Sequence, residues 1–196
     1  MIKLDNMEIK YLGSRTVWLK GKKEVVVINP EENKIPVDCR IVVVTEKNSS
    51  YLGQDEKKVV VKGPGEYEIG GVEIKGWPVG KKGVIYRLDL DGLAIGVIGQ
   101  LEEILDNDLS DKVGGFDILI FDIGCSLIKG KDWRELAKKW GVNYLIPVGG
   151  KPDSKVLVTF LDEVDEEGLE PIESLKVDKD NLPDGLEIVL LKVEEK

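Results

Sequence analysis

The first half of the chain alternates apolar and polar positions in a pattern that predicts strands joined by tight turns. Residues 85–90 alternate clearly, and Asp91-Gly92 then separates them from a second apolar run. An Asp-Gly or Gly-Gly pair between two such runs is a β-hairpin signal, and Gly70-Gly71 repeats it. Apolar runs at 25–28 and 41–45 predict further buried strands. These hairpins require antiparallel pairing.

The second half of the chain changes to alternating strand and helix signals. Residues 116–123 form an apolar run that is typical of a buried strand. Residues 131–141 predict the clearest helix, with Asp132 as its N-cap, Glu135 three residues later and Gly141 at its end. The other expected elements are a short helix at 101–109, a strand stopped by Pro147, a helix within 154–168, and a turn and last strand within 182–195.

This order of elements indicates a two-layer or sandwiched α/β fold rather than a doubly wound parallel sheet. The chain has 196 residues, of which 42% are hydrophobic. That length suits one core, and neither a linker nor a short repeat divides the chain. We therefore expect a single domain over residues 1–196.

Charge and composition restrict the partners. The net charge of −9 argues against nucleic acid, which is normally bound by a basic patch. No apolar segment reaches the roughly 20 residues that a membrane span needs. The first ten residues contain no apolar signal region. We expect a cytoplasmic protein in which Cys39 and Cys125 are reduced, buried thiols.

The sequence contains no histidine, which restricts the chemistry most strongly. Histidine is the usual general acid or base near neutral pH and the commonest metal ligand. A zinc site would have to use Cys, Asp and Glu alone, and there are only two cysteines. The segment with Asp122, Gly124 and Cys125 has two interpretations: a carboxylate or thiolate that projects into a pocket from a strand end, or a plain strand terminus with a small-residue turn.

Four segments together resemble the metallo-β-lactamase superfamily, in particular its small, single-domain hydrolase-like members. They are MEIKYLGSRTVWLKG, VVVINP, IVVVTEKNSSY and KGPGEYEIGGVEIKG, and LDGLAIGVIGQ and YLIPVGG follow in the expected order. The resemblance implies an α/β fold: an αββα sandwich of two mainly antiparallel mixed sheets flanked by helices. It also implies a metal site at one edge of the two sheets.

The residues at the family's metal-binding positions differ from the usual ligands. The family's loop Thr-His-x-His-x-Asp-His corresponds to TEKNSSY here, and its early Gly-His-Ser/Thr site corresponds to Gly13-Ser14-Arg15-Thr16. Asn29 replaces the aspartate of Asp-Pro, Gln100 replaces a bridging aspartate, and the position of one further histidine lies near Gly80. The resemblance thus implies a vestigial site at Ser14, Asn29, Glu46, Asn48, Ser50, Tyr51, Gln100 and Gly149.

Among these positions only Glu46 carries a carboxylate, whereas zinc requires three or four N, S or carboxylate ligands. Without a metal there is no acidified water for hydrolysis. The resemblance therefore implies a non-catalytic pseudo-enzyme without a cofactor, which serves as a scaffold for a protein partner, for a homo-oligomer or for a ligand. The alternative is a metal-dependent hydrolase of unknown substrate whose site uses Glu46, Asp122, Tyr51 and Lys47 with Mg²⁺ or Mn²⁺.

Overall fold

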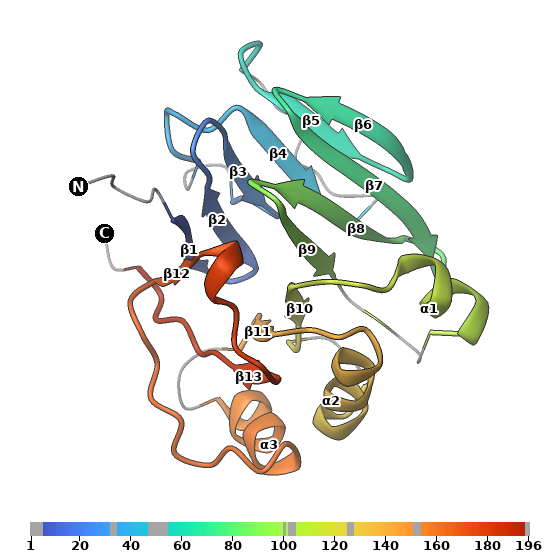
Figure 1. Ribbon diagram of the computed structural model, residues 1–196, viewed down its shortest axis with the longest axis vertical. Helices are drawn as coiled ribbons and strands as arrows, with labels where there is room; N and C mark the ends of the chain where they lie inside the picture. Colours follow the sequence, from blue (N-terminus) through green and yellow to red (C-terminus); the bar gives the residue numbers. More distant parts are fainter. Residues whose placement is uncertain are drawn as a thin grey trace.

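The computed structural model describes residues 6–31, 35–46, 55–99, 101, 105–124, 128–150 and 154–194. Their strands form two sheets (Figure 1). The six-stranded sheet contains, in spatial order, β12 (Leu175–Val177), β1 (Met7–Gly13), β2 (Thr16–Lys20), β3 (Val25–Ile28), β4 (Ile41–Val44) and β5 (Val59–Lys62). The seven-stranded sheet contains β13 (Glu187–Ile188), β11 (Tyr144–Val148), β10 (Ile118–Asp122), β9 (Leu93–Ile98), β8 (Gly83–Leu90), β7 (Val72–Val79) and β6 (Gly65–Ile69).

Both sheets are mixed, and their antiparallel parts are the predicted hairpins. Gly70-Gly71 joins β6 to β7, and Asp91-Gly92 joins β8 to β9, where Leu90 pairs with Leu93. Strands β3, β4 and β5 pair in parallel, as do β9, β10, β11 and β13. The predicted sandwich of two mixed sheets is therefore confirmed.

The main hydrophobic core lies between the two sheets. Alternation along β10 shows how a strand serves two layers: Ile118 and Ile120 face this core, whereas Leu119 and Phe121 face the helices. The helices are α1 (Asn107–Val113), α2 (Gly130–Lys139) and α3 (Lys155–Glu163). The ring centroids of Phe121 and Trp133, which is on α2, are 4.4 Å apart. The helices thus cover the outer face of the seven-stranded sheet.

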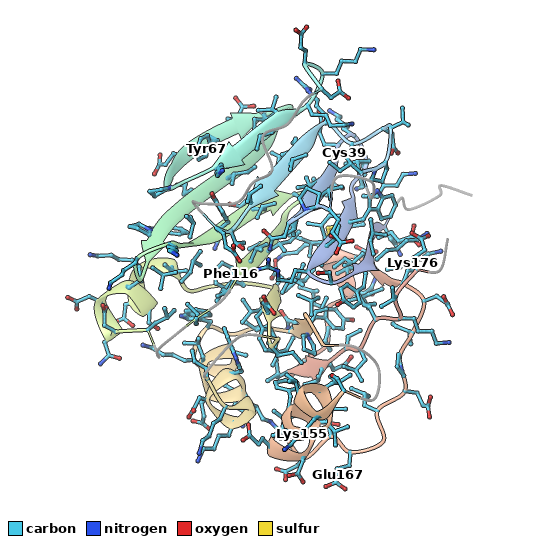
Figure 2. The ribbon with its side chains drawn as sticks, turned by 180° about the vertical axis from the view of Figure 1, so that it is seen from behind. Cys39, Tyr67, Phe116, Lys155, Glu167 and Lys176 are labelled. Carbon is cyan, nitrogen blue, oxygen red and sulfur yellow. The ribbon has the colours of Figure 1, made fainter. Side chains whose placement is uncertain are left out.

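The outer face of the six-stranded sheet carries a smaller apolar cluster. It contains Val25, Val27, Val42, Val44 and the buried, unpaired Cys39. Within the described ranges no helix covers this face. In the view from behind, Cys39 lies at the end of the molecule opposite Lys155 of α3 (Figure 2). Cys125 lies outside the described residues. No helix of the described part is long and apolar enough to cross a membrane.

The starts of two helices differ from the prediction. The first helix begins at Asn107 rather than near residue 101, and the carboxylate of Asp106 caps it. The second begins at Gly130, so the prediction of Asp132 as its N-cap was wrong. The Gly130 N–H instead donates to the Glu163 carboxylate of α3. Gly141 ends this helix as predicted, with φ +68°.

Two strand predictions near the C-terminus also needed correction. Pro147 does not stop its strand but lies inside β11, where it is paired with Phe121. The last regular strand is limited to Glu187–Ile188. Beyond it, Leu191 and Val193 form isolated parallel bridges, the latter with Tyr11 of the other sheet.

Tyr86 stabilises the place where the chain passes from one sheet to the other. β5 belongs to the six-stranded sheet and β6 to the seven-stranded one, and Gly63 lies between them. The Tyr86 hydroxyl accepts a hydrogen bond from Gly63 N at 2.8 Å and donates one to Gly63 O at 3.0 Å. Burial raises the pKa of Tyr86 to about 12, so the hydroxyl keeps its proton.

Candidate functional site

The candidate site lies where the ends of β4 and β10 meet the turn between β1 and β2. Glu46 follows β4, Asp122 ends β10, and Arg15 lies in the turn. Arg15 Nη1 forms an ion pair with Glu46 Oε1 and lies 3.8 Å from Asp122 Oδ2. The side chains of Arg15 and Glu46 are 35% and 32% exposed, whereas that of Asp122 is 2% exposed. One guanidinium nitrogen thus faces two carboxylates, one of them buried.

The Asp122 carboxylate is held by only one of its oxygens. Oδ1 accepts a hydrogen bond from Gly124 N at 2.8 Å. Oδ2 is buried and has no hydrogen-bond partner in the described part of the chain. Burial raises the pKa of Asp122 above its ordinary value, and the nearby Glu46 charge acts in the same direction. The Gly124 N–H and the Arg15 guanidinium oppose this shift without cancelling it.

Tyr11 connects the turn to the end of β11. Its hydroxyl donates to Ser14 O at 2.6 Å and accepts from Gly149 N at 3.2 Å. Ser14 has φ +53°, a left-handed conformation that is uncommon outside glycine. The hydroxyl therefore joins two of the predicted positions, Ser14 and Gly149, through their backbones. In the sequence, Tyr11 stood out only as part of the segment MEIKYLGSRTVWLKG.

Asn29 fixes the start of the loop that bears Glu46. Its Oδ1 accepts hydrogen bonds from Thr45 N at 2.9 Å and from Thr45 Oγ1 at 3.1 Å. Thr45 O in turn accepts from Val84 N at 2.8 Å, and Glu46 forms a bridge with Gly83. The Asn29 side chain thus positions a neighbouring loop, and its oxygen is already occupied by two donors.

Two glycines allow Asp122 to occupy its place. A Cβ atom on Gly149, which has φ +85°, would lie 2.0 Å from Asp122 Oδ1. A Cβ on Gly124 would lie 2.5 Å from Gly149 O. The small-residue turn and the buried carboxylate, which were alternative interpretations of this segment, are therefore parts of one arrangement.

The structure brings together Ser14, Asn29, Glu46 and Gly149 of the predicted positions. It adds Asp122, predicted as a candidate, and Arg15 and Tyr11, which sequence reasoning missed. Gly80 lies in the turn between β7 and β8, with open space around it. Asn48, Ser50, Tyr51, Gln100 and Lys47 lie outside the described residues.

These residues do not fit the metal that the resemblance implies. A cation bound between Glu46 and Asp122 would lie beside the Arg15 guanidinium, which carries a permanent positive charge. The resemblance aligns Gly149 with a family histidine, and any side chain at position 149 would displace Asp122. The described ranges contain no group of three or more His, Cys, Asp or Glu side chains placed to hold a metal.

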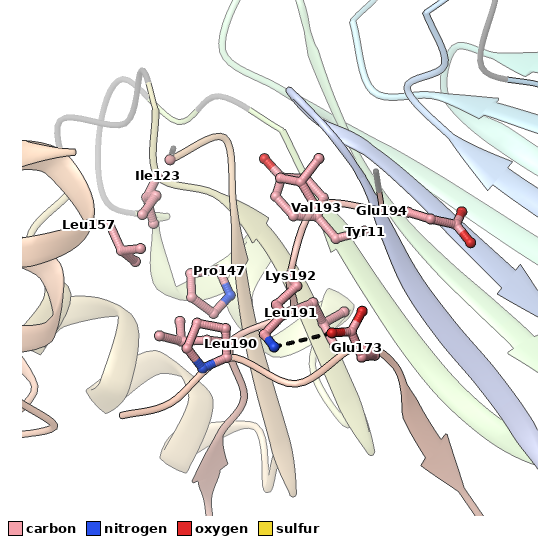
Figure 3. Close-up of a pocket in the computed structure, with 12 residues that line it drawn as sticks. Tyr11, Ile123, Pro147, Leu157, Glu173, Leu190, Leu191, Lys192, Val193 and Glu194 are labelled. Atoms are coloured by element: carbon pink, nitrogen blue, oxygen red, sulfur yellow. Dashed lines mark hydrogen bonds and ion pairs between the residues drawn. The ribbon is translucent and has the colours of Figure 1, made fainter. Parts of the chain in front are cut away.

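Tyr11, whose hydroxyl contacts Ser14 and Gly149, also lines a cavity of about 710 Å³ (Figure 3). Its polar part includes an ion pair between Lys192 Nζ and Glu173 Oε1 at 3.1 Å. Glu194 at its rim pairs with Lys10 at 3.0 Å. The apolar lining is formed mainly by Tyr11, Ile123, Pro147, Leu157, Leu190 and Leu191. The cavity thus combines an apolar wall with charges that are already paired.

Comparison with solved structures supports the fold. A proposed Zn-dependent hydrolase of the metallo-β-lactamase superfamily from Thermotoga maritima is 21% identical with a TM-score of 0.78, over 94% of this chain and 98% of that one. A proposed metal-dependent hydrolase from Parabacteroides distasonis is 14% identical with a TM-score of 0.65, over 95% and 94% of the two chains. A diphosphatase of the PhnP family is 11% identical with a TM-score of 0.58, over 95% of both chains.

Comparison at the level of sequence places the chain in a family. A search of curated proteins gives no significant match. The model of the family described as "Beta-lactamase superfamily domain" matches residues 8–149. That range includes Arg15, Glu46, Asp122 and Gly149, and it covers well over half of the chain. The protein therefore belongs to the metallo-β-lactamase superfamily, as the four sequence segments predicted.

Proposed function

We propose that this protein is a non-catalytic member of its superfamily, a pseudo-enzyme that binds a ligand or partner and needs no metal cofactor. The observation that carries the proposal is the position of Arg15 between Glu46 and Asp122. The positive charge that faces these carboxylates belongs to the chain itself.

The chemistry of the cluster supports this proposal. Hydrolysis by metal-dependent enzymes uses a cation to lower the pKa of a bound water. A guanidinium has no open coordination position, and it stays protonated at every physiological pH. The chain has no histidine to act as a general base in its place. In the described cluster, Arg15 thus offsets the charges of Glu46 and Asp122, and no group is placed to activate water.

The cavity beside Tyr11 favours a small molecule as the ligand. Its volume of about 710 Å³ falls within the range of about 300–1,000 Å³ that is usual for ligand sites. Its wall is largely apolar, and Lys192 and Glu173 supply a polar end. We place the protein in the cytoplasm, with no nucleic-acid partner because of its charge of −9. The alternatives to a small-molecule ligand are a protein partner and self-association into a homo-oligomer.

A second function is favoured by one observation. The buried Asp122 Oδ2 has no hydrogen-bond partner among the described residues, and a hard cation shared with Glu46 would satisfy it. This would make the protein a hydrolase with a carboxylate-based site. Such a function requires Arg15 to move away from both carboxylates when the cation binds.

Elemental analysis of the untagged protein distinguishes the two functions. The protein is dialysed against zinc and manganese, then assayed for metal and for hydrolysis of a generic ester and a phosphodiester. We expect less than about a tenth of an equivalent of metal and no turnover. Close to one equivalent, together with turnover that is lost in Glu46→Ala, would replace the pseudo-enzyme proposal with the hydrolase.

A further inference from the structure

We propose that Arg15 is a built-in replacement for a bound cation, and that Glu46 and Asp122 form a latent divalent-cation site that opens when Arg15 is removed. The inference rests on the proposed function, because both hold that the natural protein needs no metal between these carboxylates. It assigns to Arg15 a role that neither the family nor the sequence pattern gives it.

The first argument is geometric. Glu46 and Asp122 come from the ends of strands in different sheets, and a single atom, Arg15 Nη1, faces both of them. The turn that carries Arg15 is held in place by the hydrogen bond from Tyr11 Oη to Ser14 O. Gly149 N donates to the same hydroxyl, so the end of β11 fixes it as well. The guanidinium is thus held where the two carboxylates converge.

The second argument is the charge requirement of the cluster. Asp122 is buried, and a buried carboxylate without an opposite charge is strongly unfavourable. Its Oδ2 has no hydrogen bond in the described part of the chain, so the guanidinium at 3.8 Å is the positive charge placed to offset it. Without Arg15, the charge on Asp122 is offset either by another cation or by a proton, which burial already favours at this carboxyl by raising its pKa.

The third argument concerns the donor atoms that would become available. Removing Arg15 frees Asp122 Oδ2 and the Glu46 carboxylate, while Asp122 Oδ1 stays bound to Gly124 N. Carboxylate oxygens with water in the remaining positions suit Mg²⁺ or Mn²⁺. In the wild type, repulsion between the guanidinium and a divalent cation a few ångströms away opposes binding. Arg15 therefore prevents Glu46 and Asp122 from binding a divalent cation in the wild type.

The test compares Mn²⁺ binding by the wild type and by Arg15→Gln, using calorimetry and the electron paramagnetic resonance signal of free Mn²⁺. Arg40→Gln is the matched control, because it removes an arginine that pairs with Glu24 at 2.9 Å on the surface. We expect Arg15→Gln to bind one Mn²⁺ at least about tenfold more tightly than the wild type or the control. The gain should disappear in the double variant Arg15→Gln/Glu46→Gln.

The outcomes separate this inference from the proposed function. If Arg15→Gln binds Mn²⁺ no better than Arg40→Gln, the inference is overturned while the pseudo-enzyme proposal stands. If the wild type itself binds one Mn²⁺ through Glu46, both fail. If Arg15→Gln does not fold without metal, the readout is recovery of its circular dichroism spectrum on adding Mn²⁺. Failure to recover would then count against the inference.

Discussion

Asp122 Oδ1 occupies the space where a side chain at Gly149 would begin, 2.0 Å from the ideal Cβ position. Position 149 corresponds to a histidine in the family, according to the resemblance of the segment YLIPVGG. The buried aspartate and a side chain at 149 therefore exclude each other in this backbone. Glycine at position 149 and the present position of Asp122 thus depend on each other.

Gly149→Ala should destabilise the protein by about 2–4 kcal/mol, measured by urea unfolding. The alanine would adopt φ +85° and would also collide with Asp122. Gly168→Ala is the control, because Gly168 has φ +82° with open space around it, and we expect a cost of about 1 kcal/mol there. Adding Asp122→Ala should recover part of the loss in Gly149→Ala. No difference between the two glycine variants would refute the collision.

A double-mutant cycle should find a coupling energy of about 1 kcal/mol between Arg15 and Glu46. Both side chains are about one third exposed, so solvent screens their ion pair and high salt should weaken it further. Arg15→Ala should be more destabilising than Glu46→Ala, because it also leaves the buried Asp122 without its opposite charge. The reverse order of the single variants would contradict this assignment of charges.

Asp122→Asn should change how stability depends on pH. Burial raises the pKa of Asp122 from its ordinary value of 3.8, so the folded protein holds this proton more tightly than the unfolded chain does. The stabilisation from that proton is present at low pH and is lost as pH rises through the raised pKa. The stability of the asparagine variant relative to the wild type should therefore increase as the pH rises from the ordinary carboxyl pKa through the raised one. A constant difference would show that Asp122 has an ordinary pKa.

Asn29→Ala should cost about 2 kcal/mol in thermal or urea unfolding. It removes the acceptor for Thr45 N and Oγ1 and places alanine at φ +45°. Asn29→Asp keeps an acceptor oxygen and tolerates this conformation, so it should retain most of the stability. Equal losses in the two variants would show that the Asn29 side chain does not hold the loop.

The hairpins were predictable because their signal is local. Gly-Gly and Asp-Gly pairs supply the positive φ angles that two-residue turns require, and the flanking alternation sets the strands. The start of α2 was not predictable in this way. The group that binds Gly130 N is the Glu163 carboxylate, 33 residues further along the chain. Asp132, which the local pattern chose as the cap, lies inside the first turn.

The candidate site was predictable only as a set of substituted positions. Residue-by-residue comparison identified Ser14, Asn29, Glu46 and Gly149, but it does not show which side chains meet. Arg15 acquires its importance from contacts with residues 46 and 122, which only the folded chain brings near. A usable signal was present, however. Arg15, a permanent cation, lies next to Ser14, which the resemblance aligns with a metal-binding position of the family.

The hydrogen bonds between Tyr86 and Gly63 allow separation of the two sheets to be measured at a single amide. Gly63 N–H is protected by a hydroxyl from β8, not by a partner in its own strand ladder. Its exchange with deuterated solvent therefore requires the hydrogen bond to the Tyr86 hydroxyl to break. The protection factor of the Gly63 amide thus gives the free energy of opening the connection between the two sheets.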